Sequence, residues 1–205
     1  MSSCNNKYKK NNIFKLFLCP NSSSKYFLLI NIFFIFLIFF ERRFLYFRDY
    51  SIIWDGAYRL TQGMTPYTDF GIPVGPVSFY LPALFFYLFG ASWLNLQLSQ
   101  LVINIALIVI AWKLLNEIQL NKFISNLGLV FFTLNYVILL SHPWYNTTGA
   151  FLFLLNILLI LKYKAHTNFL AGLICITCIF TKQDYGLMSL VSSIVLVLFT
   201  NKDHL

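Results

Sequence analysis

One acidic side chain opens a polar segment within an otherwise apolar chain. Asp49 follows Arg48 at the start of residues 49–60, which have the spacing of a helix. A carboxylate at a helix start accepts backbone N–H bonds and faces the positive end of the helix dipole, which keeps it ionised. An ionised carboxylate beside lipid headgroups can also accept a proton from an attacking hydroxyl. Asp49 is therefore either a helix cap or a general base, and its position leaves both roles open.

The segment after Asp49 has the pattern of an amphipathic helix. One stripe of apolar residues recurs at helical spacing, and it consists of Tyr50, Ile53, Trp54, Ala57 and Leu60. The polar residues of the opposite side are Ser51, Asp55, Arg59 and Gln62. We expect a helix that rests on a membrane surface with its polar face toward water. Gly63 then suits a left-handed helix cap, after which Pro66-Tyr67 turns the chain away.

Further polar residues suggest a binding site near this helix. Asp55 and Arg59 are four residues apart with the acid first, so they form either a structural ion pair or part of a substrate site. Lys182, in a later turn, either pairs with a lipid phosphate or extends from a helix end toward the membrane surface. The candidate substrate-binding residues are Asp55, Arg59, Tyr67, His142 and Lys182, and Tyr145 falls in the same turn as His142.

The composition indicates an integral membrane protein. Hydrophobic residues make up 59% of the 205 residues and charged residues only 11%, whereas a soluble domain is nearer half apolar and a quarter charged. The net charge of +8 comes from lysines and arginines in short loops and in the N-terminal tail. Such residues are topology signals beside membrane helices, so we expect no nucleic-acid partner and no soluble hydrolase.

The apolar blocks predict an all-α integral membrane protein, a polytopic bundle with about six transmembrane helices. The expected spans are residues 26–40, 96–115, 123–140, 148–161, 168–181 and 185–200. Their few polar residues are expected to form hydrogen bonds between helices, namely Gln97, Gln100, Asn104, Asn135 and Asn156. Residues 1–24 read as a disordered cytoplasmic tail ahead of a transmembrane domain at 25–205.

Residues 74–94 are expected to lie in the membrane interface rather than to cross the bilayer. They contain Pro76, Pro82 and many aromatic side chains, which suit the headgroup boundary. With this segment flat and the N-terminus cytoplasmic, most lysines and arginines fall inside, whereas a spanning segment would place most of them outside. The first external loop, about residues 48–95, then shares the outer face with turns 141–147 and 181–184, and it carries interfacial amphipathic helices.

Four cysteines give no metal or redox signature. Cys4 and Cys19 lie in the basic tail, where thiols stay reduced. Cys175 and Cys178 form a Cys-x-x-Cys within an apolar segment, without further Cys or His at metal-binding spacing. The pair is either a thiol relay in the membrane or two small packing residues of a helix, and we prefer the packing interpretation.

The first-loop pattern resembles that of polytopic C-type glycosyltransferases, the family 39 protein mannosyltransferase and lipid A aminoarabinose transferase group. The matching positions are Asp49, Tyr58, Gly63, Pro66, Tyr67, Asp69 and Phe70, then Gly75-Pro76, Phe79-Tyr80-Leu81 and Leu88-Phe89-Gly90. Ala171-Gly172-Leu173 and Thr181-Lys182-Gln183 match a later helix of that group. The chain departs from the group at Tyr50, where many members carry Glu after the Asp.

The resemblance implies an inverting transfer of a sugar from a polyprenyl-phosphate donor to an acceptor hydroxyl of a glycan, lipid or protein. Asp49 would be the catalytic base and Lys182 a ligand of the lipid phosphate, at the external face of a bacterial inner or plasma membrane. The resemblance leaves open whether a divalent metal assists. Members of the group are usually about twice as long, so we expect an N-terminal part, active alone or with a complementary C-terminal chain.

A second interpretation belongs to a different class of function. The same membrane architecture suits a non-catalytic subunit, an inactive fragment or a carrier for lipid-linked sugars. The two interpretations differ in Asp49, because only an enzyme of the first kind requires that carboxylate for sugar transfer.

Overall fold

The computed structural model describes residues 22–41, 48–118, 120–138, 145–162 and 165–200, and the secondary structure within these ranges is helical, without a β-strand. The expected all-helical fold is therefore confirmed. The helices are α1 (Ser22–Glu41), α2 (Arg48–Thr61), α3 (Val77–Phe89), α4 (Trp93–Glu117), α5 (Lys122–Phe132), the π-helix η2 (Thr133–Ile138), α6 (Tyr145–Leu161), α7 (Ala165–Ile179) and α8 (Gln183–Thr200). Each of the six expected spans falls on one of these helices, with η2 continuing α5.

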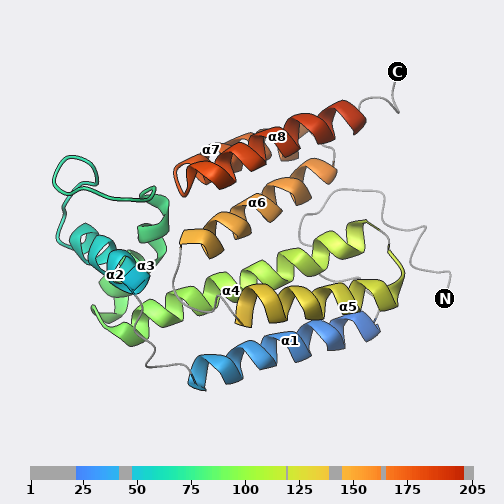
Figure 1. Ribbon diagram of the computed structural model, residues 1–205, viewed down its shortest axis with the longest axis horizontal. Helices are drawn as coiled ribbons and strands as arrows, with labels where there is room; N and C mark the ends of the chain where they lie inside the picture. The colour runs from blue at the N-terminus through green and yellow to red at the C-terminus, as the bar shows by residue number, and fades with distance from the viewer. Residues whose placement is uncertain (1–21, 42–47, 119, 139–144, 163–164, 201–205) are drawn as a thin grey trace.

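Helices α1, α4, α5, α6, α7 and α8 run along the long axis of the molecule, and α2 and α3 lie together at one end (Figure 1). The long α4 contacts α1, α3, α5 and α6, while α6 also contacts α7 and α8. The contact between α4 and α6 therefore joins an α1–α4–α5 group to an α6–α7–α8 group.

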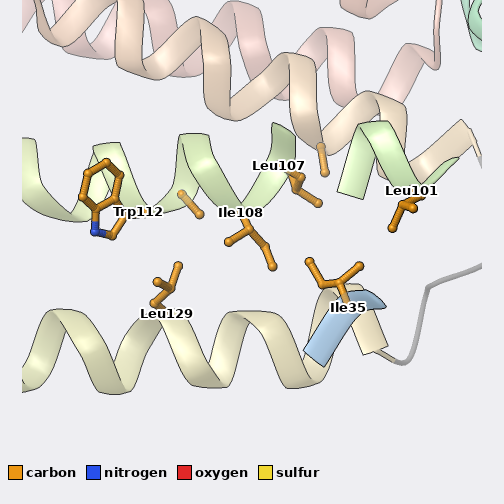
Figure 2. Packing of buried hydrophobic residues seen from close by; sticks show 8 residues of the cluster. Ile35, Leu101, Leu107, Ile108, Trp112 and Leu129 are labelled. Atoms are coloured by element: carbon orange, nitrogen blue, oxygen red, sulfur yellow. The ribbon is translucent and has the colours of Figure 1, made fainter. Parts of the chain in front are cut away.

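The main apolar core lies where α1, α4, α5 and α6 meet. Its buried side chains include Ile35 of α1, Leu107, Ile108 and Trp112 of α4, and Leu129 of α5 (Figure 2). Ile108 and Leu129 are fully enclosed. Burying a side chain of this size contributes roughly 1.5–3 kcal/mol in water, and within lipid the same contacts contribute by close packing.

Buried polar side chains connect the helices of the bundle, as the sequence predicts for Gln100 and Asn156, whereas Asn104 accepts from Gln100 within α4. Gln100 donates to Asn104 Oδ1 at 2.8 Å and to Thr147 Oγ1 at 2.7 Å, which joins α4 to α6. Asn156 of α6 donates to the hydroxyls of Ser189 and Ser193 of α8, each at 2.7 Å. These bonds satisfy donors that no water reaches.

Asn135 departs from the expected interhelical role. Its side-chain amide donates to the Phe131 carbonyl of the same helical segment at 2.9 Å. The residue is exposed, so a local carbonyl is its nearest acceptor.

Within the described residues, one helix is long and apolar enough to cross a membrane. This helix is Trp93–Glu117, or α4. Shorter apolar helices occur at Lys25–Leu37, Val77–Phe89, Tyr145–Leu161, Thr167–Ile179 and Gln183–Leu198. The described residues thus contain one candidate membrane span, which is consistent with membrane association. The multi-pass topology stays a prediction.

The expected helix after Asp49 is present as α2, but its apolar stripe does not lie open for a membrane. Tyr50, Ile53 and Ala57 are buried against Phe79, Ala83 and Phe86 of α3 and Leu96 of α4. The expectation of a stripe resting on lipid is therefore corrected, because α3 supplies the apolar partner surface. The opposite face is exposed at Ser51, Asp55 and Gln62, as its polar residues predict.

The end of α2 confirms the predicted glycine cap. Gly63 has a φ of 78°. Its N–H bonds the Leu60 carbonyl and the Met64 N–H bonds the Arg59 carbonyl, both at 3.1 Å. This pair of bonds is a Schellman motif, which satisfies carbonyls that the last helical turn leaves open.

Segment 74–94 forms two pieces rather than one flat element. The 13-residue α3 ends at Gly90, where a φ of 89° turns the chain. Ser92 then caps α4 by accepting from the Asn95 N–H at 3.2 Å. A helix of this length spans about 20 Å, which is less than the apolar thickness of a bilayer.

The contact between α2 and α3 requires a glycine, and we predict that Gly56→Ala destabilises the protein. A Cβ at residue 56 would lie 2.7 Å from Phe79 Cδ1, so the two helices would have to separate. We expect a loss of roughly 1–3 kcal/mol, measured as a lower thermal unfolding midpoint of the purified protein. Gly172→Ala is the control, because nothing lies within 4 Å of a Cβ there. An unfolding midpoint for Gly56→Ala equal to that of this control would contradict the packing.

Candidate functional site

A cavity of about 470 Å³ lies between the loop that precedes α3, the start of α6 and the turn from α7 to α8. Its lining includes Tyr67, Val74, Gly75, Tyr145, Lys182 and Asp184. These segments belong to the end of the bundle that carries α2 and α3 (Figure 1). Residues far apart in sequence thus form one concave site.

Two backbone hydrogen bonds hold the loop to the α7–α8 turn. The Gly75 N–H donates to the Thr181 carbonyl at 3.1 Å, and the Val77 N–H donates to the Phe180 carbonyl at 3.3 Å. A side chain at residue 75 would collide with the Phe180 carbonyl oxygen. Glycine is therefore required where the loop closes one wall of the cavity.

Lys182 is the cation of this cavity, and several groups surround its ammonium. Nζ donates to Asn146 Oδ1 at 3.0 Å and lies 3.2 Å from Asp184 Oδ2. The ring centroids of Tyr145 and Tyr185 are 5.3 Å and 5.9 Å from Nζ, within the range of cation–π attraction. The ammonium is thus held at a defined place in the cavity wall, where it attracts an anionic group as a point charge.

The N-terminus of α8 adds to this positive potential. Lys182 directly precedes α8, whose first residues Gln183 and Asp184 also line the cavity. The first turn of a helix carries a partial positive charge and favours anions. Cavity, ammonium and helix end together suit a phosphate ester better than a neutral ligand.

Tyr67, one of the candidate binding residues, lines the same cavity. Its side chain is 64% exposed, and its φ of 70° lies in the left-handed region, which is uncommon for a residue other than glycine. The turn is fixed by bonds from the Tyr67 N–H to the Phe70 carbonyl at 3.0 Å and from the Thr65 N–H to Asp69 Oδ2 at 2.6 Å. An exposed aromatic ring on a hydrogen-bonded turn therefore lies at the cavity.

Asp55 and Arg59 pair with each other on the outer face of α2. Arg59 Nε donates to Asp55 Oδ2 at 2.8 Å, and the guanidinium lies 5.5 Å from the centre of the Phe70 ring. Neither residue is among those that line the cavity. The pair connects α2 to the loop after it, which favours the structural role of the two considered from sequence.

Asp49 lies in the first turn of α2, and its side chain and His142 fall outside the described residues. The direction of α2 nevertheless fixes the region of Asp49. The Tyr50 ring meets Trp93 after the end of α3, with centroids 6.4 Å apart, whereas Gly56 faces Phe79 near the start of α3. The two helices are antiparallel, so Asp49 lies toward the end of α2 remote from the loop 72–76.

Three residues of the Lys182 surroundings were not among the sequence candidates: Asn146, Asp184 and Tyr185. Asn146-Thr147-Thr148 matches a glycosylation acceptor pattern, but Thr147 is fully buried and accepts from Gln100. The signal that could have found Asn146 and Asp184 is their presence in the same two turns as Tyr145 and Lys182. Within the described residues, no group of three or more His, Cys, Asp or Glu could hold a metal ion.

Comparisons with known proteins add no further information on this site. No family model, no curated protein and no solved structure matches the chain.

We predict that Gly75→Ala loosens the loop that closes the cavity. The methyl group would push the loop from the Phe180 carbonyl and weaken both backbone bonds. Each bond contributes about 1 kcal/mol, so we expect amide hydrogen exchange at Val77 to accelerate by about tenfold or more. Gly71→Ala is the matched control in the same loop, because nothing lies within 4 Å of its Cβ. Equal exchange rates in the two variants would show that the loop does not depend on this contact.

Proposed function

We propose that this chain is a multi-pass membrane glycosyltransferase, or the N-terminal part of one. It moves a sugar from a polyprenyl-phosphate donor to an acceptor hydroxyl at the external face, with inversion. The observation that carries the proposal is the ammonium of Lys182 in a cavity at the end of an apolar helical bundle. A lipid phosphate is the anion that such a position would meet in a membrane.

The distribution of polar and apolar side chains supports a membrane location. Gln100, Asn104 and Asn156 are buried between helices. Large apolar side chains are exposed on the outside of the bundle, for example Phe33, Phe34 and Leu37 of α1, Phe169, Leu173 and Ile176 of α7, and Leu187, Val191, Ile194 and Leu198 of α8. Exposed apolar area on this scale is unfavourable in water and favourable against lipid chains. With the charge distribution of the loops, it supports a bundle of about six spans with a cytoplasmic N-terminus.

The donor phosphate would bind at Lys182. Asn146, Tyr145 and Tyr185 hold the ammonium, so a ligand meets a positive charge that is already in place. The cavity volume of about 470 Å³ accommodates a phosphate with one sugar ring. The exposed ring of Tyr67 offers an apolar face against which the sugar can lie.

Asp49 is the proposed general base. It lies two helical turns before Gly56, which is about 10 Å along the axis of α2. An in-line reaction places the ammonium, phosphate, sugar carbon, acceptor oxygen and carboxylate in sequence, which also spans about 10 Å. For this carboxylate to act, the sugar and the acceptor would have to lie along α2 between the cavity and Asp49.

The reaction then proceeds as a direct displacement at the sugar carbon. The acceptor oxygen forms a bond to that carbon while its proton passes to Asp49. The bond from the same carbon to the phosphate oxygen breaks, and the lipid phosphate leaves with the electron pair. Lys182 stabilises the charge that develops on this phosphate. Attack opposite the leaving group inverts the configuration.

The proposed topology predicts a specific labelling pattern. In a variant with Cys4 and Cys19 replaced by Ser, we introduce Ser51→Cys on α2 and Gln183→Cys beside the cavity. Both thiols should react with an impermeant maleimide added outside intact cells. Asn121→Cys, between α4 and α5, should react only after permeabilisation, and the parent variant measures the background of Cys175 and Cys178, which are buried. Labelling of positions 51 and 183 from opposite sides would exclude the shared site.

The proposed chemistry predicts that Asp49→Asn abolishes sugar transfer. Asn keeps nearly the size and shape of the Asp49 side chain but cannot accept the proton, so general-base catalysis worth about 10²–10⁴-fold is lost. The measurement is transfer of a labelled sugar from a polyprenyl-phosphate donor in membranes that contain the protein. Lys182→Met should raise the donor concentration needed for half-maximal rate, because it removes the phosphate contact.

Glu117→Gln controls for the loss of a charge, since Glu117 is exposed at the end of α4 and outside the cavity lining. We expect it to transfer sugar like the wild type at equal expression. Undiminished transfer by Asp49→Asn would exclude this carboxylate as the base. Donor binding without transfer by the wild type would favour a carrier instead.

A further inference from the structure

We propose that Asp184 is the resident counter-ion of the cavity, which an anionic lipid headgroup must displace from Lys182. Asp184 would thereby set how much negative charge a ligand needs in order to bind. The inference rests on the proposed role of Lys182 as the ligand of the donor phosphate. It concerns a carboxylate that the proposed chemistry does not use.

The partners of Lys182 are of two kinds. Asn146, Tyr145 and Tyr185 are neutral and come from the packed helices α6 and α8. Asp184 is the charged partner at 3.2 Å, and its side chain is 69% exposed whereas that of Lys182 is 30% exposed. The neutral partners can therefore remain in place while the carboxylate turns outward.

Neutralisation in the empty cavity has a physical basis. The Lys182 side chain is partly removed from water, so its ammonium gains from a nearby counter-charge. Asp184 supplies that charge when no ligand is bound. A bound phosphate and the Asp184 carboxylate would both need the Lys182 ammonium, so they compete for it. The measured affinity then reflects the difference between the two interaction free energies.

When Asp184 leaves Lys182, its carboxylate does not become a buried, unpaired charge. The residue lies in the first turn of α8, where the helix dipole stabilises a carboxylate irrespective of the ion pair. Its exposed side chain also regains water when it leaves Lys182. An exposed ion pair of this kind contributes little, so displacement by a phosphate is feasible.

Competition with a carboxylate makes the cavity selective for charge. A neutral headgroup carries no negative charge that could replace the Asp184 carboxylate beside Lys182. A phosphate monoester carries between one and two negative charges near neutral pH, whereas a phosphodiester carries one. The lipid phosphate released by sugar transfer should therefore bind more tightly than the sugar-linked donor.

The test measures affinity of the purified full chain in detergent micelles for farnesyl phosphate. We expect Asp184→Asn to bind about two- to fivefold more tightly than the wild type, because the competitor is gone. Lys182→Gln should lose most of the binding, and the double variant should show no gain over Lys182→Gln. Glu117→Gln should bind like the wild type, and farnesol, which lacks the phosphate, should not respond to Asp184→Asn.

Inorganic phosphate distinguishes a lipid headgroup from a free anion. Tighter binding of farnesyl phosphate than of inorganic phosphate supports the headgroup as the ligand. Equal binding of both would reject the headgroup. Unchanged or weaker binding of farnesyl phosphate by Asp184→Asn would show that the carboxylate positions Lys182 rather than blocks it, and a gain that persists without Lys182 would also reject the counter-ion.

The failure of this inference is separable from the failure of the proposed chemistry. Binding experiments involve no sugar transfer, so they do not depend on Asp49. Tightening by Asp184→Asn together with undiminished transfer by Asp49→Asn would retain the counter-ion and exclude the base. Loss of transfer by Asp49→Asn without tighter binding by Asp184→Asn would retain Asp49 as the base and exclude Asp184 as the counter-ion.

Discussion

The site depends on two backbone hydrogen bonds between the loop before α3 and the end of α7. The carbonyls of Phe180 and Thr181 lie in the turn directly after α7, and they accept hydrogen bonds from the N–H groups of Val77 and Gly75. The same bonds bring the loop against the turn that carries Lys182. The same two bonds fix the α7–α8 turn and close the cavity, and both require the absence of a side chain at Gly75.

The sequence predicts the features that depend on neighbours along the chain. The period of the apolar residues gives the location of α2, and Gly63 gives its end, because helix faces and caps are set within a few residues. The long apolar blocks likewise locate α1 and α4 to α8, and the buried roles of Gln100 and Asn156 follow from polarity within those blocks.

Other features depend on residues that are distant in sequence, and the pattern does not contain them. An amphipathic stripe fits a membrane and a partner helix equally, so only the fold shows that α3 covers Tyr50, Ile53 and Ala57. The surroundings of Lys182 likewise combine the start of α6 with the start of α8. A lysine at a helix end looks the same from sequence with or without Asn146 beside it.

The packing of α2 against α3 has a consequence for any chemistry that uses Asp49. Gly56 and Phe79 meet so closely that the axial register of the two helices is fixed at that point. A shift of one helical turn would move Asp49 by about 5.4 Å relative to the loop, which exceeds the tolerance of proton transfer. The register is in turn connected to Lys182, because the loop before α3 is bonded to the α7–α8 turn. In the proposed reaction, a base on α2 and a phosphate ligand before α8 would act together through this sequence of contacts, so Gly56 and Gly75 would matter without touching a substrate.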